Sequence, residues 1–260
     1  MKAGRRPDPD PTPMATTPPL PTASRDGPLR VVGIDVGGAR KGFHAVALSD
    51  GAHAERFSSA DPRALAAWCR QQQATVIAID APCLWSVDGR MRPCERALHR
   101  QGIRCFASPS REQAIAHPSD YFGWMLRGEA LYLALAPSHP LCRGLPLSGP
   151  CCFETFPHAI TWQLRGGNAE AAQKRHQRRE LLEQAGVALA SLTSIDWIDA
   201  ALCALAAHRI ASGASCLVYG EPDSGLILVP AGPGGGASSQ GRSSARQQPA
   251  EQPFCNLVPP

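Results

Sequence analysis

The sequence lacks any apolar run that approaches the roughly 20 residues needed to span a membrane. Its first residues also lack the apolar centre of a secretion signal, because the segment 1–28 is rich in proline and polar residues. We therefore expect a cytoplasmic protein that does not act on or in a membrane.

Closely spaced cysteine pairs are also missing. The chain has ten cysteines, but they are scattered and none stands in a CxxC arrangement. This placement favours reduced, mostly buried thiols in a cytosolic protein. A zinc site is the alternative, although structural zinc sites favour tight ligand pairs. Its ligands would be Cys83, Cys94, His99 and Cys105.

A strong charge of one sign and an internal repeat are absent as well. Lys and Arg number 26 against 22 Asp and Glu, and the net charge of +4 is compatible with an anionic substrate without requiring one. The ends of the chain, 1–28 and 231–260, hold mostly Pro, Gly, Ser, Thr and Gln. Such segments cannot bury enough apolar surface to offset the entropy of ordering, so we expect two disordered tails around one domain at 29–230.

The first half of that domain predicts a sheet. Apolar and β-branched residues at 30–36, 43–49 and 52–57 are separated by glycine turns, which indicates an antiparallel meander. A helix begins at Pro62, and the nearly all-apolar segment 75–80 is typical of a strand covered on both faces. Helices are then expected at about 92–101, 121–135, 157–165, 169–185 and 195–212, and short strands within 151–157, 215–219 and 225–229. The result is an α/β fold with a mixed sheet flanked by helices.

Four carboxylates stand at conspicuous places. Asp35 and Asp80 end apolar strands, Glu154 interrupts a short strand, and Asp199 lies at the start of an apolar helix. Neighbouring parallel strands would bring Asp35 and Asp80 to one edge of the sheet. Crowded carboxylates raise one another's pKa, and divalent cations relieve that cost. We therefore expect these four acids to bind Mg²⁺ or Mn²⁺ and to act in catalysis.

Two metal ions about 3.5–4 Å apart can hold the attacking water and the leaving oxygen of a phosphodiester, so no nucleophilic side chain is required. Structural roles remain open for each acid. Asp35 and Asp80 could cap turns, and Glu154 could lie on an edge-strand surface. Asp196 and Asp199 stand in the first turn of a helix, where the helix dipole favours acids in any protein.

Basic residues near these strands could contact nucleic-acid phosphates, or they could form an ordinary solvated surface. The candidates for substrate binding are Arg40, Lys41, Arg92, Arg96 and Arg111. A second basic group within 174–179 is expected to form the outer face of a helix.

The segment from Gly33 to Gly42 resembles the first-strand motif of ribonuclease H-like nucleases. More closely, an ordered set of short motifs is similar to the family called domain of unknown function 429, whose members are regarded as predicted nucleases of ribonuclease H-like fold. These motifs are Gly33-Ile34-Asp35, Ile79-Asp80-Ala81-Pro82, Arg92 to Arg96, Ser108-Pro109-Ser110-Arg111, Glu154 to Ala159 and Asp199 to Ala207. The resemblance implies a ribonuclease H-like mixed sheet, a metal-dependent nuclease activity on DNA or RNA, and Asp35, Asp80, Glu154 and Asp199 as the acids that carry it.

Two other functions remain open. The domain could keep this fold as a non-catalytic module that binds nucleic acid or a protein, because fold alone does not decide function. The Asp-x-Gly-Gly sequence at 35–38 also resembles the first phosphate loop of actin-like and sugar-kinase-type ATP-binding phosphotransferases. Those proteins pair two such domains, and this chain has no second Asp-x-Gly-Gly sequence.

Overall fold

The computed structural model describes residues 27–232. The two predicted disordered tails lie almost wholly outside the described residues. The strands are β1 (Arg30–Val36), β2 (Phe43–Ser49), β3 (Ala52–Ser59), β4 (Val76–Asp80), β5 (Cys151–Glu154), β6 (Cys216–Glu221) and β7 (Gly225–Pro230). The α-helices are α1 (Pro62–Gln71), α2 (Pro93–Arg100), α3 (Arg111–Ala116), α4 (Gly123–Leu135), α5 (Pro157–Leu164), α6 (Lys174–Gln184) and α7 (Ile195–Ala211).

The strands form one mixed sheet in the order β3-β2-β1-β4-β5-β7-β6. β1, β2 and β3 pair antiparallel as a meander, β4, β5 and β7 continue the sheet in parallel, and β6 returns antiparallel beside β7. The predicted α/β class, with a three-strand meander joined to parallel strands, is therefore confirmed. The arrangement is compatible with a ribonuclease H-like fold.

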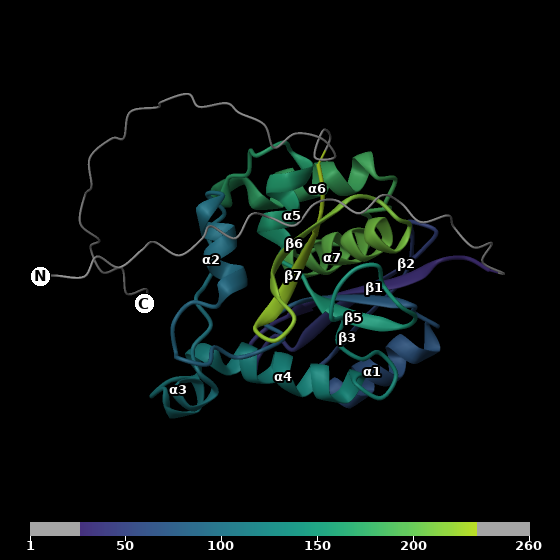
Figure 1. Cartoon of the computed structure of the whole chain (residues 1–260). Helices are drawn as coiled ribbons and strands as arrows, with labels where there is room; N and C mark the ends of the chain where they lie inside the picture. Colours follow the sequence, from purple (N-terminus) through teal and green to yellow (C-terminus); the bar gives the residue numbers. More distant parts are fainter. Residues whose placement is uncertain (1–26, 233–260) are drawn as a thin grey trace, which may run out of the picture.

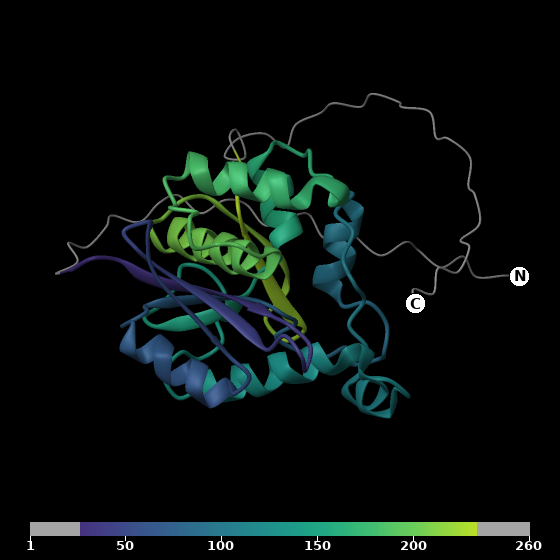
Figure 2. The same ribbon diagram turned by 180° about the vertical axis from the view of Figure 1, so that it is seen from behind.

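Helices cover both faces of the sheet. α7 lies on one face with α5 and α6 outside it, and α1 and α4 lie side by side on the other face (Figures 1 and 2). Successive residues of a strand pack into the cores on opposite faces of the sheet, because their side chains point to opposite faces in turn. Val31 and Ala78 belong to the apolar core under α7, whereas Val32 and Ile79 belong to the core under α1 and α4.

The contact between α7 and β1 is unusually close because β1 has a glycine at its centre. A Cβ atom added to Gly33 would lie 2.0 Å from the Ala204 backbone nitrogen and 2.1 Å from the Ala200 carbonyl oxygen. The helix backbone therefore rests directly on the strand. This approach sets the height of α7 above the sheet and brings its first turn close to the end of β1.

Most expected elements are present, and the differences are local. α3 is not among the helices predicted from the sequence. Its N-cap is Ser110, which exchanges side-chain-to-backbone hydrogen bonds with Gln113. The helix expected at 169–185 begins only at Lys174, after a 3-10 turn, and β5 ends at Glu154 rather than continuing toward Pro157. Pro157 instead begins α5, where its missing N–H group costs no hydrogen bond.

Within residues 27–232, no helix has both the length and the apolar character needed to cross a lipid bilayer. The nine cysteines of this part of the chain are all free thiols.

The close approach at Gly33 gives a direct test of the packing. Gly33→Ala would force a methyl group into the α7 backbone, so we expect a loss of about 3 kcal/mol or more of unfolding free energy in urea denaturation. Gly38→Ala is the matched control, because a Cβ atom there meets nothing within 4 Å. Equal stability of the two variants would contradict this account of the helix–strand contact.

Candidate metal centre

Two aspartates end the central parallel strands at the same level. Asp35 of β1 is paired in register with Asp80 of β4, so their side chains project to the same face of the sheet. That face is the one under α7, because Gly33 lies two residues before Asp35 and touches the helix. Within residues 27–232, neither carboxylate has a hydrogen bond or ion pair to a protein group. Each is only partly buried, so solvent reaches the pair.

The first turns of α7 bring two further acids to this edge. Ser194 caps the helix by accepting a hydrogen bond from the Trp197 N–H group, which fixes where the helix begins. Asp199 is then 8% exposed and points toward the sheet edge, while Asp196 forms an ion pair of 2.7 Å with Lys41. The structure therefore places three of the four predicted acids, Asp35, Asp80 and Asp199, close enough at this edge for their charges to act on one another.

The pKa values of Asp35, Asp80 and Asp199 are all raised. Burial, followed by the negative charge of Asp80 and then of Asp199, raises the pKa of Asp35 well above its usual value. Burial and the charge of Asp199 raise the pKa of Asp80 to about 8. Burial also raises the pKa of Asp199, although its ion pair with Arg178 opposes this effect. The site therefore has more negative charge than its surroundings neutralise.

Two cations from α6 face this cluster. Arg178 is 6% exposed and forms a buried ion pair with Asp199, and the charges of Arg178 and Lys174 both lower the pKa of Asp80. The prediction that the basic group 174–179 forms the outer face of a helix is wrong for Arg178. Its position follows from α6 packing against α7, which sequence spacing within α6 does not reveal.

Glu154 lies outside this cluster. In the parallel pairing of β4 and β5 it is aligned with Ile79 rather than Asp80, so its side chain projects to the opposite face of the sheet. There it accepts hydrogen bonds from Arg92 Nη2 at 2.6 Å, from Arg92 Nη1 at 2.9 Å and from the Cys83 N–H group at 2.8 Å. The alternation of β5 is the only sequence signal for this outcome, and it requires the register to be known.

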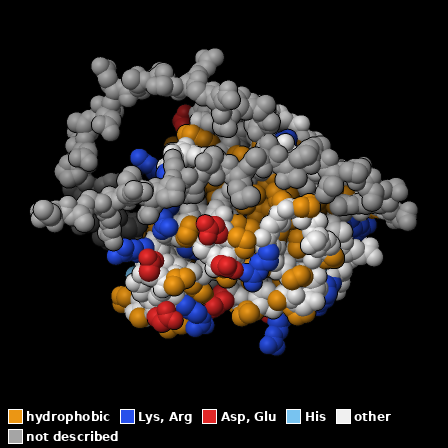
Figure 3. All heavy atoms as spheres, viewed as in Figure 1, with side chains coloured by type: hydrophobic (Ala, Val, Ile, Leu, Met, Phe, Trp, Pro, Cys, Tyr) orange, Lys and Arg blue, Asp and Glu red, His pale blue; other side chains and the backbone are white. Residues whose placement is uncertain are grey.

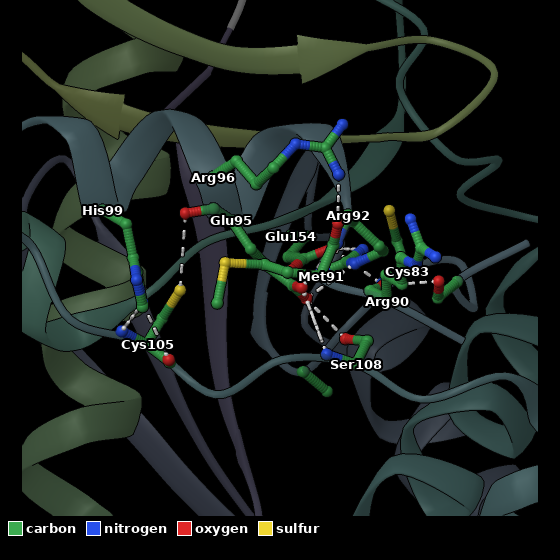
Figure 4. A network of polar contacts seen from close by, with 12 residues as sticks. Cys83, Arg90, Met91, Arg92, Glu95, Arg96, His99, Cys105, Ser108 and Glu154 are labelled. Carbon is green, nitrogen blue, oxygen red and sulfur yellow. Dashed lines mark hydrogen bonds and ion pairs between the residues drawn. The ribbon is translucent and has the colours of Figure 1, made fainter. Parts of the chain in front are cut away.

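Arg92 is the centre of a second buried network. Its Nε atom donates to Glu95 at 2.8 Å, and Glu95 also accepts from the N–H and hydroxyl groups of Ser108. Figure 4 shows Glu95 and Glu154 converging on Arg92 from α2 and β5. The network therefore ties the segment after β4, α2 and the loop at Ser108 to the sheet. The sequence predicts Glu154 as a metal ligand and Arg92 as a substrate-binding residue. In the structure the two form an ion pair with one another, which depends on the register of β5 and on the position of α2.

The other predicted substrate-binding cations differ in exposure. Arg40 and Lys41 are exposed in the turn that follows β1, close to Asp35. Arg96 donates to the Met91 carbonyl, and Arg111 pairs with Glu129 at 2.9 Å on the surface. On the visible part of the face in Figure 3, acidic and basic side chains are interspersed rather than gathered by sign.

A small pocket borders Asp80 on the Arg92 side, with about 50 Å³ of room. Its lining combines the carboxylates of Glu95 and Glu154 with the aromatic rings of Phe106 and Trp124, which meet at 6.4 Å between ring centroids. Phe106 is 65% exposed. The pocket therefore offers apolar ring surface directly beside the acidic edge of the sheet.

The donor set fits a hard divalent cation at Asp35 and Asp80. Both side chains offer carboxylate oxygens, which Mg²⁺ and Mn²⁺ prefer, and neither is engaged by a protein donor in the described residues. Over residues 27–232, no group of three or more His, Cys, Asp or Glu side chains is placed to hold a metal ion, so the candidate centre consists of these two carboxylates. The alternative zinc ligands are likewise not gathered, and His99 instead contacts the backbone of Cys105 at 3.1 Å.

The glycine turn after β1, at 37–42, uses three of its six amides internally, including that of Gly37. The N–H group of Gly37 donates to the Gly42 carbonyl at 2.9 Å, and those of Lys41 and Gly42 donate to the Gly38 carbonyl at 3.0 Å. A phosphate loop needs such amides to face the ligand. The geometry of this turn therefore gives no support to the ATP-binding alternative.

Taken together, the mixed sheet and the acids at its central edge define an α/β protein with a candidate metal centre. The family model described as "protein of unknown function (DUF429)" matches residues 33–224, and the chain belongs to that family. Comparison with the curated proteins and with the solved structures finds no match.

The raised pKa of Asp80 predicts a pH effect on stability. The folded protein retains this proton up to about pH 8, whereas the unfolded chain loses it near 3.8, so the folded state binds more protons in between. The unfolding free energy contributed by Asp80 should therefore fall as pH rises through this window. We expect Asp80→Asn to gain on the order of 2 kcal/mol over wild type between pH 5 and pH 8. Denaturant titrations of both proteins at each pH test this, and parallel pH curves would contradict it.

The Arg92 network predicts a structural role for Glu154. Glu154→Gln leaves a buried guanidinium with one fewer carboxylate, so we expect a loss of about 3 kcal/mol of unfolding free energy. Arg111→Met, which removes an exposed ion pair, should leave stability close to wild type. Urea denaturation measures both, and a Glu154→Gln variant as stable as wild type would show that the pair does not hold these segments.

Proposed function

We propose that this protein is a divalent-metal-dependent phosphodiesterase that cleaves DNA or RNA. One observation carries the proposal: two in-register aspartates, Asp35 and Asp80, lie side by side under α7, and neither has a hydrogen bond or ion pair to another residue within 27–232. Such a pair is costly unless a cation occupies the space between its members. A structural cap would instead direct its oxygens at backbone N–H groups, and neither side chain does so within the described residues.

In this proposal, Asp35 and Asp80 hold Mg²⁺ or Mn²⁺, which lowers the pKa of a bound water and polarises a phosphate oxygen. Asp199 adds negative charge from α7 at the same edge and keeps the cluster selective for cations. Lys41 and Arg40 extend from the neighbouring turn, where they would contact the phosphate backbone of the substrate. Glu154, which pairs with Arg92, holds the segment after Asp80 in place instead of binding the ion.

The pocket beside Asp80 supports a nucleic-acid substrate rather than a small phosphate ester. Phe106 and Trp124 present ring surface next to the acidic edge, and nucleobases stack on such rings without strong dependence on sequence. Phe106, which is 65% exposed, would offer the adjoining base a ring at the surface beside Asp80.

Cleavage assays test the proposal. Wild-type protein with Mn²⁺ or Mg²⁺ should cut single-stranded, duplex, hybrid or branched nucleic acid, and chelation should stop it. Asp35→Asn and Asp80→Asn should each lower the rate by about 100-fold or more, because the metal supplies several kcal/mol of transition-state stabilisation.

The control is Asp223→Asn, since this acid is fully exposed near Arg143, far along the chain from the cluster, and its loss should leave cleavage unchanged. Cleavage that survives both chelation and the two variants would overturn the proposal. Binding of nucleic acid without metal dependence and without cleavage would favour the non-catalytic module instead.

A further inference from the structure

Arg178 of α6 contacts the acidic cluster through Asp199, and its positive charge bears on how many metal ions the site can bind. We propose that the Arg178 guanidinium provides the second positive charge of the centre, so that the site takes one divalent ion, between Asp35 and Asp80. The inference rests on the proposed function, because it requires those two carboxylates to bind metal.

Arg178 is built into the protein interior. It is 6% exposed, and one of its terminal nitrogens is ion-paired with Asp199, which is itself 8% exposed. Its Nε atom is buried and has no hydrogen-bond partner within the described residues. A guanidinium in this setting is always charged, and both packing and its partner fix its position. It is therefore a permanent cation of the site rather than a surface side chain that can swing away.

The negative charges of Asp199 and Asp35 are balanced by different cations. Asp199 has its own cation, and Arg178 also acts on Asp80, whereas the main cation acting on Asp35 is the exposed Lys41. The uncompensated position therefore lies between Asp35 and Asp80. A second divalent ion beside Asp199 would have to approach a buried guanidinium of like charge, and the low local dielectric strengthens that repulsion.

Arg178 acts as a positioning residue. It holds Asp199 through one terminal nitrogen, and its charge also acts on Asp80. The positive charge that a second metal ion would supply is then part of the fold.

The experiment counts bound ions in the full chain. Isothermal titration with Mn²⁺, together with electron paramagnetic resonance of the saturated protein, should give one ion for wild type and no spin coupling between paired manganese ions. Arg178→Met removes the charge but keeps the aliphatic bulk, and we expect it to bind two ions. Arg178→Lys should return the count to one. Arg179→Met, which alters the adjacent residue of the same helix, should behave as wild type.

The outcomes separate the two proposals. Two ions in wild type, or one ion with unchanged affinity in folded Arg178→Met, would overturn the role of Arg178 and leave the metal centre standing. No ion in wild type at millimolar Mn²⁺ would overturn both. Should Arg178→Met fail to fold, the wild-type count and its resonance spectrum decide the matter alone, because a coupled manganese pair contradicts the proposal.

Discussion

The backbone contact between α7 and Gly33 is the constraint on which the rest of this structure depends. It allows a helix to lie directly on the central strand, two residues before the acid that ends that strand. A larger residue would lift the helix and carry Asp199 away from Asp35 and Asp80. Both the apolar core under α7 and the position of Asp199 beside Asp35 and Asp80 therefore depend on the absence of a side chain at Gly33.

The two buried charge systems at the sheet edge differ in how they are neutralised. On one face, Arg92 takes both Glu95 and Glu154, and every charged group there has a close partner. On the other face, Asp35 and Asp80 have none within the described residues, and their pKa values are raised. A fully paired network such as the first is typical of structural support. Unpaired carboxylates with raised pKa values, as in the second, are typical of functional sites.

Much of the fold could be predicted because its strands follow simple patterns. The residues 76–79 are all apolar, and the turns before Phe43 and after Asp50 contain glycine, so the meander and the first parallel strand follow from local chemistry. The place of Glu154 could not be predicted in this way, because a strand residue changes face with a one-residue change in register. Arg178 was missed for a related reason: its partner Asp199 lies on another helix, so spacing within α6 alone does not show that it is buried.

The ion pair between Lys41 and Asp196 joins the β1–β2 hairpin to the start of α7 across the rim of the site. Lys41 is 59% exposed, so hydration of its ammonium group and the entropy of its side chain keep this link weak. A polyanion lying along the rim would compete with Asp196 for the same ammonium group. The contact between the hairpin tip and α7 is therefore sensitive to any anion that binds at the rim.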